Sequence, residues 1–207
     1  AVGFQGVRGY QGDLFTSGFS FNVPTQEMVD QFETGDNRKD VAILDIDAWA
    51  TSTGAEFTTG YEHTGYYNRK YLPRKRGADA AGDLNLTNPN NYRAIRYADV
   101  LLMAAEANNR KTSPNGGKAR TYLNLVRARA FGNSSNNISL SGQALTDAIY
   151  HERRVELVGE GHHFFDLVRT GRGANIPGFT SGKHEVFPIP LEEIQFSQDN
   201  WSQNTGY

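Results

Sequence analysis

Apolar residues recur at helical spacing through the middle of the chain. One such stripe is formed by Ile95, Ala98, Leu101, Leu102 and Ala105. Steps of three and four residues place these side chains on one face, so a helix is predicted to begin near residue 92. Similar stripes predict further helices over 119–130, 142–158 and 162–170, and a glycine follows each of these within two residues. Residues 92–170 are therefore expected to form a helical scaffold.

The first 91 residues show little periodicity and contain many glycines. We predict loops over 1–22, a short helix from Thr25 to Gly35, and a strand over 41–50. Long loops should fill most of 51–91, with a second strand over 66–72.

The end of the chain is predicted to be an irregular tail over 171–207, with a strand over 185–189. The sequence thus favours one domain over 1–207: a loop-rich, aromatic-bearing part (1–91), a helical scaffold (92–170) and the tail. The expected fold class is mainly α with long loops and a few short strands.

Composition narrows the classes of function. The 207 residues include no cysteine, which excludes disulfides and thiolate metal sites. The net charge of −2 gives no basic excess for nucleic acid. No run of 18 apolar residues is present, and no signal-peptide pattern opens the sequence.

Two carboxylates continue an apolar stripe on the predicted helix over 142–158. The stripe runs through Leu145, Ile149, Glu152 and Glu156. Glu152 and Glu156 could form an acid/base pair, or they could belong to a structural ion network. Candidate partners for such a network are Arg127, Arg129, Arg153, Arg154 and Arg169. Because so many arginines would lower carboxyl pKa values, the sequence favours the network.

No metal or cofactor is expected. His162 and His163 are adjacent, so they point to different faces of a helix and cannot chelate together. His151-Glu152 is followed by Arg153, which breaks the HExxH pattern, and no GxSxG or phosphate-binding glycine pattern occurs.

Six motifs in order resemble those of the SusD/RagB family of nutrient-binding proteins. They cover about 22–207 and are Phe32-Glu33-x-Gly35-Asp36-x-Arg38, the run from Arg96 to Ala107, the run from Leu123 to Ala130, Glu152-Arg153-Arg154-Val155-Glu156-Leu157, the run from Glu160 to Arg169, and Phe187-Pro188-Ile189-Pro190 with Gln203-Asn204-x-Gly206-Tyr207. Asn37, His163 and Thr205 depart from the family pattern at single positions. The resemblance implies that the carboxylate stripe is scaffold.

The resemblance also implies a location and partners. Such proteins are anchored on the extracellular face of the outer membrane through a lipidated N-terminal cysteine. They deliver oligosaccharides or peptides to a SusC-like TonB-dependent transporter without cleaving them. Their helical, TPR-containing N-terminal half is absent from this sequence, so we expect a C-terminal piece with an exposed apolar face on its helices.

The aromatic residues suggest how a glycan would be held. Sugar faces stack on flat rings while polar side chains bond the hydroxyls. The candidate ligand-binding residues are Trp49, Tyr61, Tyr66, Tyr67, Tyr10, Asn68 and Arg69. Packing of these rings in a small core is the simpler alternative for each. A peptide-binding RagB-like protein, a glycoside hydrolase using Glu152 and Glu156, and a protein-interaction scaffold are the competing functions.

Overall fold

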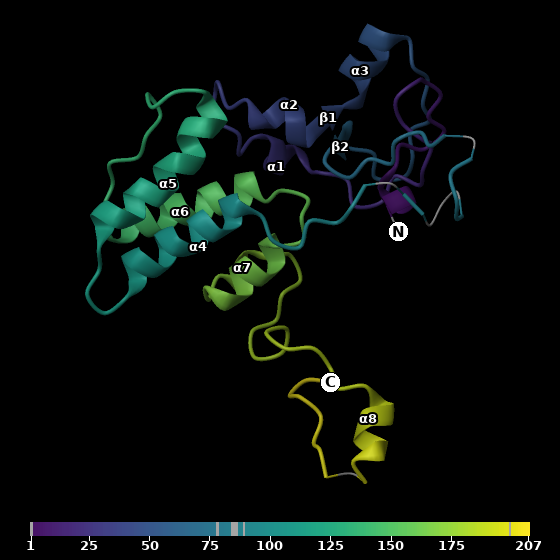
Figure 1. Ribbon diagram of the computed structural model, residues 1–207. Coiled ribbons are helices and arrows are strands. Elements are labelled where there is room, and N and C mark those ends of the chain that lie inside the picture. Colours follow the sequence, from purple (N-terminus) through teal and green to yellow (C-terminus); the bar gives the residue numbers. More distant parts are fainter. Residues whose placement is uncertain (1, 78, 84–86, 89, 199) are drawn as a thin grey trace. The chain divides into compact units, whose positions relative to one another are not determined.

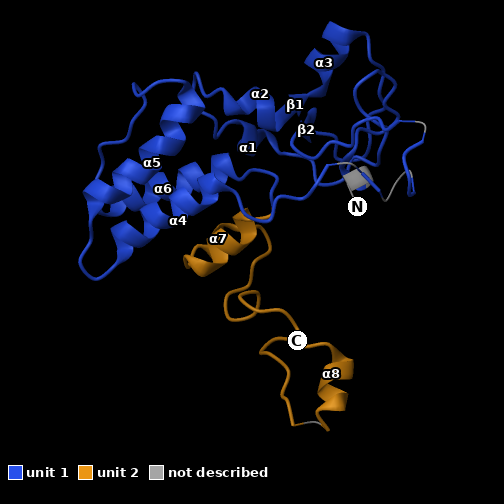
Figure 2. Cartoon of the chain, in the orientation of Figure 1, with its two compact units in different colours: residues 1–160 blue, residues 161–207 orange. Residues whose placement is uncertain are grey.

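The structure, a computed structural model, describes residues 2–77, 79–83, 87–88, 90–198 and 200–207 (Figure 1). The chain forms two compact units, residues 1–160 and residues 161–207 (Figure 2). In its described part the fold is mainly helical, with two short strands, as the sequence predicts.

Three long helices form the main core of the first unit (Figure 1). They are α4 (Tyr97–Arg110), α5 (Gly116–Phe131) and α6 (Gly142–Glu156). Their shared core consists of Leu101, Leu102, Ala105, Ala119, Leu123, Val126, Leu145 and Ile149. These are the stripes that the apolar spacing predicts, although α4 begins five residues later than expected.

Local signals determine where α5 begins and ends. The Asn115 side chain accepts a hydrogen bond from the Lys118 amide at 3.0 Å and caps the first turn. Gly132 ends the helix in the left-handed conformation, with φ +73°, which favours glycine. The predicted stop at this glycine is confirmed.

The predicted strand over 41–50 and the predicted helix after Thr25 are both too long. The chain instead forms α1 (Gln26–Val29), α2 (Arg38–Ala42), β1 (Ile43–Asp45) and α3 (Ile46–Thr53). Asp45 ends the strand because its carboxylate accepts the Ala48 amide and caps α3.

A two-stranded antiparallel ladder joins β1 to β2 (Tyr66–Asn68), which is shorter than the predicted strand over 66–72. Leu44 lies opposite Tyr67, and both enter a second core. This core of the loop-rich part contains Val7, Tyr10, Phe15, Leu44, Ile46, Tyr67 and Leu72. The loops between the 3-10 helix η1 (Val2–Gln5) and α1 contribute Val7, Tyr10 and Phe15 to this core and are therefore ordered by packing.

The second unit contains α7 (His163–Arg169), the 3-10 helix η2 (Gly173–Asn175) and α8 (Leu191–Phe196). No strand forms over 185–189, so that prediction is wrong. The backbone N–H and C=O of Ile189 instead bond the side-chain amide of Gln203, each at 2.8 Å. A side chain thus satisfies the groups that a partner strand would have bonded.

The described helices include none that combines the length and the apolar character needed to cross a membrane. On α4, Tyr97, Val100 and Met103 follow one another in steps of three and are exposed. They form an apolar strip on a helix whose other face is the main core.

Candidate functional site

A pocket of about 540 Å³ lies beside α2, β1 and α3 and gathers three of the predicted ligand-binding residues. Trp49, Tyr66 and Arg69 line it. The remaining lining residues are Lys39, Asp40, Ile43, Leu44, Asp45, Ala48 and Ser52. A pocket of this size, with aromatic walls and a few polar groups, is typical of a site for a small organic ligand.

The indole of Trp49 is held firmly at this pocket. Its Nε1 donates a hydrogen bond to the Tyr10 hydroxyl at 3.1 Å, and its ring lies 5.6 Å from that of Phe15. The Arg69 guanidinium lies over the ring, 5.4 Å from its centroid. The hydrogen bond, the contact with Phe15 and the nearby cation fix the orientation of the indole, which lowers the entropic cost of binding.

Arg69 and Tyr66 are positioned by contacts with neighbouring helices. Arg69 Nη1 donates to the Asp40 carbonyl at 2.8 Å, and the Tyr66 hydroxyl donates to Gln26 Oε1 at 3.0 Å. The pocket therefore combines flat apolar rings with fixed donors and carboxylates. Such a surface suits a ligand that has both an apolar face and hydroxyl groups.

The other four candidates lie outside the residues that line this pocket. Tyr10 and Tyr67 fill the second core, and Tyr67 is 0% exposed. Asn68 is buried and donates to the Gly159 carbonyl at 2.9 Å. Tyr61 is 92% exposed. Ligand binding by these four residues stays a prediction.

Sequence reasoning missed the polar residues that complete the pocket. Lys39 and Asp40 lie on α2, a helix that the sequence did not predict. Asp45 lies inside the strand predicted over 41–50, and it caps α3. One signal could have revealed that the strand ends and a helix begins here. Asp45 is followed by a run of residues that a helix accepts, which is the pattern of an N-cap.

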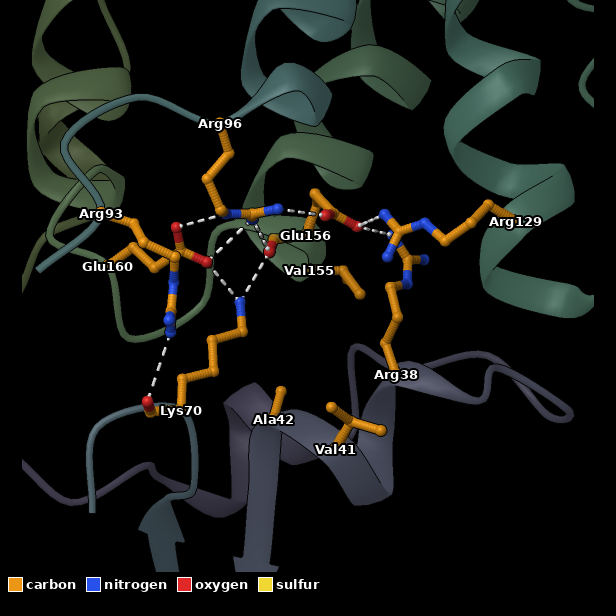
Figure 3. Close-up of a pocket in the computed structure, with 10 residues that line it drawn as sticks. All are labelled: Arg38, Val41, Ala42, Lys70, Arg93, Arg96, Arg129, Val155, Glu156 and Glu160. Carbon is orange, nitrogen blue, oxygen red and sulfur yellow. Dashed lines mark hydrogen bonds and ion pairs between the residues drawn. The ribbon is translucent and has the colours of Figure 1, made fainter. Parts of the chain in front are cut away.

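A second, smaller pocket of about 220 Å³ lies on the other side of α2 and is shown in Figure 3. Five cations line it: Arg38, Lys70, Arg93, Arg96 and Arg129. Two carboxylates, those of Glu156 and Glu160, and the aliphatic Val41, Ala42 and Val155 complete the wall.

Glu156 is the centre of the ion network at this pocket. Its Oε2 accepts from Arg38 Nη1 at 2.9 Å and from Arg129 Nη2 at 2.6 Å, and its Oε1 accepts from Arg96 Nη1 at 2.9 Å (Figure 3). Burial alone would raise the pKa of this carboxyl, but the hydrogen bonds and charges of the three arginines outweigh it and lower its pKa to about 2.

Glu160 and Glu152 are bound in the same manner. Glu160 accepts from Lys70 Nζ at 2.6 Å and from Arg96 Nε at 2.8 Å. Burial opposes ionisation of Glu160, yet these two cations lower its pKa. Glu152, 1% exposed, accepts from Arg38 at 2.6 Å and from Arg127 at 2.7 Å. A general acid needs a raised pKa, so the lowered pKa of Glu156 makes this carboxyl unsuited to acid catalysis.

The structure gives each arginine predicted for the network an acidic partner. Arg127 and Arg129 bond Glu152 and Glu156, whereas Arg153 bonds Asp99 at 2.8 Å. Arg154 bonds Glu27, and Arg169 bonds Asp166 on its own helix at 2.6 Å. Sequence reasoning missed Arg38, Lys70, Arg96 and Glu160 because they come from distant parts of the chain and no short spacing connects them.

In the part of the chain that the structure describes, no group of three or more His, Asp or Glu side chains could hold a metal. His162 is the residue that precedes the first turn of α7, and His163 begins that helix.

A sequence model of the SusD family matches residues 44–185, which is more than half of the chain. Among curated proteins, SusD-like protein P2 of Formosa agariphila is 30% identical over 98% of this chain and 43% of its own length. SusD-like protein P25 of the same organism is 28% identical over 95% of this chain and 37% of its own length. The chain thus spans less than half the length of these relatives.

Solved structures agree with this family match. A laminarin-binding SusD-like protein shares 38% identity at a TM-score of 0.81, over 99% of this chain and 43% of its own. Surface glycan-binding protein A from Bacteroides thetaiotaomicron, in complex with laminarihexaose, shares 26% identity at a TM-score of 0.79, over 99% of this chain and 46% of its own.

Proposed function

The chain belongs to the SusD family, and on that premise we propose that it binds an oligosaccharide without cleaving it, in the pocket of Trp49, Tyr66 and Arg69. The observation that carries the proposal is the fixed indole of Trp49 in a pocket of about 540 Å³. A sugar face can stack on such a ring while Asp40, Asp45 or Arg69 bonds its hydroxyls.

Two further points support glycan binding. Two similar solved proteins are described as binding laminarin and laminarihexaose. In addition, the two carboxylates that a glycosidase would need are buried among arginines inside the network, and the pKa of Glu156 is lowered to about 2.

We also propose the wider role of the whole protein. It would lie on the extracellular face of the outer membrane, anchored by lipid, and would pass its ligand to a SusC-like TonB-dependent transporter. Similar solved proteins are described as surface glycan-binding proteins, which supports this location. A pull-down of the transporter with full-length protein from membrane extracts tests the partnership, and failure to recover it would contradict this part.

Calorimetric titration with laminarihexaose tests the binding pocket. Trp49→Ala should weaken binding at least about tenfold, because stacking on an aromatic ring is lost. Arg69→Gln should weaken it less. Trp201→Ala is the matched control, because this ring is exposed and does not line the pocket.

Several outcomes would contradict the proposal. Equal binding by wild type and by both pocket variants would place the site elsewhere. Because Trp49 also packs on Phe15, thermal unfolding of Trp49→Ala must show a folded protein, and Arg69→Gln decides the question if it does not. Shortened sugars after incubation would show an enzyme, and a peptide that competes with the hexasaccharide would favour the peptide-binding alternative.

A further inference from the structure

The small pocket beside α2 has more positive than negative groups at its wall. Five cations face two carboxylates there (Figure 3). Behind the wall, Arg38 also bonds Asp36 and Glu152, so its charge is balanced by deeper groups. Lys70 bonds Glu160, and Arg129 bonds Glu156. Among the described residues, the wall cation without a carboxylate partner is therefore Arg93.

The two carboxylates in the wall are already fully used. Both oxygens of Glu156 and both oxygens of Glu160 accept hydrogen bonds from the surrounding cations. An incoming anion would therefore meet no unpaired acid, and the attraction open to it is that of Arg93 together with the unused donors of Arg129.

Arg93 and Arg129 keep donors for a ligand. Among the described residues, the Arg93 guanidinium bonds only the Lys70 carbonyl, at 3.3 Å, and stacks 5.0 Å from the Tyr71 ring centroid. Arg129 is half-exposed and uses only Nη2, toward Glu156, within that same set of residues. A planar guanidinium with free N–H groups binds carboxylate or sulfate oxygens in pairs.

We propose that this pocket binds an anionic substituent, a carboxylate, of the glycan that the neighbouring Trp49 pocket holds. This inference rests on the proposed function. About 220 Å³ is below the usual range for a whole small ligand, but it accommodates one charged group. The aliphatic Val41 and Ala42 line the same wall and can contact the carbon frame that carries the charge.

The two pockets share one dividing element. Lys39 and Asp40 of α2 line the Trp49 pocket, whereas Arg38 and Val41 line the cationic one. In the segment after β2, Arg69 lines the first pocket and the next residue, Lys70, lines the second. The cationic pocket is thus a neighbouring subsite, so the ligand class is an acidic glycan.

The probes are sodium glucuronate, glucose, sodium sulfate and triglutamate, titrated into the chain by calorimetry at low and raised salt. Glucuronate should bind, glucose should not, and added salt should weaken the binding of glucuronate. No binding of glucuronate would overturn the proposal. Binding of sulfate alone would overturn it in favour of a nonspecific anion site, and tighter binding of triglutamate than of glucuronate would favour an acidic peptide.

Val41 offers a matched pair of variants that should not disturb folding, because its side chain is 68% exposed. Val41→Glu places a carboxylate at the wall and should weaken glucuronate binding by at least about tenfold, whereas the equally large Val41→Gln should leave it unchanged. Arg93→Gln should weaken it several-fold. Lys111→Gln, an exposed change of the same charge away from both pockets, is the control. Equal affinity in Val41→Glu and Val41→Gln would refute the proposal.

The same variants separate this proposal from the proposed function. Trp49→Ala should lose the binding of laminarihexaose but still bind free glucuronate. Val41→Glu should lose the binding of glucuronate but still bind laminarihexaose. If the wild type binds laminarihexaose but does not bind glucuronate, the anionic subsite is refuted and the proposed function stands.

Discussion

Glu156 holds three arginines that come from separate parts of the chain, and its oxygens are almost fully buried. A buried charge is tolerated only when it is paired and hydrogen-bonded. The carboxylate therefore connects α6 to α2, to α5 and to the segment before α4.

Glu156→Gln should lower the free energy of unfolding by about 3–5 kcal/mol, because it removes a buried counter-charge that three arginines share. Urea unfolding followed by circular dichroism measures the change. Glu27→Gln is the control: Glu27 bonds Arg154 from an exposed position, and loss of such a pair costs at most about 1 kcal/mol. Similar losses in the two variants would show that burial does not strengthen the network.

Acid should remove the contribution of Glu156 to stability. Its pKa is 4.5 ordinarily and about 2 in the folded chain, so the folded state binds fewer protons than the unfolded state between these values. The stabilisation is complete above about pH 5 and disappears as the pH falls toward 2. Urea midpoints from pH 7 to pH 2 should therefore converge for wild type and Glu156→Gln. A constant difference would contradict the low pKa.

At the scale of elements, Gly159 joins the end of α6 to β2. It has φ +72°, and a Cβ at this position would lie 2.3 Å from the Asn68 amide nitrogen. Asn68 is itself fixed by its hydrogen bond to the Gly159 carbonyl. The close approach allows the short ladder to pack on the end of the helix.

Gly159→Ala should therefore destabilise the chain more than Gly54→Ala. Gly54 has the same φ of +72°, but a Cβ there would have nothing within 4 Å, so this variant reports backbone strain alone, about 1 kcal/mol. The clash with Asn68 should add about 1–3 kcal/mol, measured by thermal unfolding. Equal losses would mean that Asn68 moves away freely.

The elements that the sequence predicts well are those with a long repeating stripe. α4, α5 and α6 each bury one face against the others, so apolar spacing and flanking glycines identify them. Over 41–50, the apolar residues belong to three short elements, α2, β1 and α3. Their spacing therefore follows neither the helical nor the strand period. The ladder partner of β1 lies more than twenty residues away, which local spacing cannot reveal.

The candidate site was predictable to a similar degree. Trp49, Tyr66 and Arg69 stand out as aromatic and polar residues in a glycine-rich region, and the fold brings them together. Tyr10 and Tyr67 have the same appearance in the sequence, yet they fill a core. Residue type alone does not distinguish a ring that lines the pocket from a ring that fills the core, because burial depends on partners distant in the chain.

At the scale of the whole molecule, the core clusters and the network of Glu152, Glu156 and Glu160 use residues of the first unit. A chain that ends at Glu160 should therefore retain cooperative thermal unfolding. Its stability should also keep the acid dependence described for Glu156. Circular dichroism melts at pH 7 and pH 3 measure both properties. A broad, non-cooperative melt at pH 7 would show that the first unit depends on residues 161–207.

Adjacent residues that line different pockets make the chain sensitive to changes in length. A substitution at Arg69 or Lys70 alters one pocket only. A deletion of one residue between Tyr66 and Lys70 would shift both side chains relative to α2 and damage the two pockets together. Natural or engineered diversity in ligand preference is therefore expected to arise here by exchange of side chains, while insertions and deletions accumulate in the loops farther from β2.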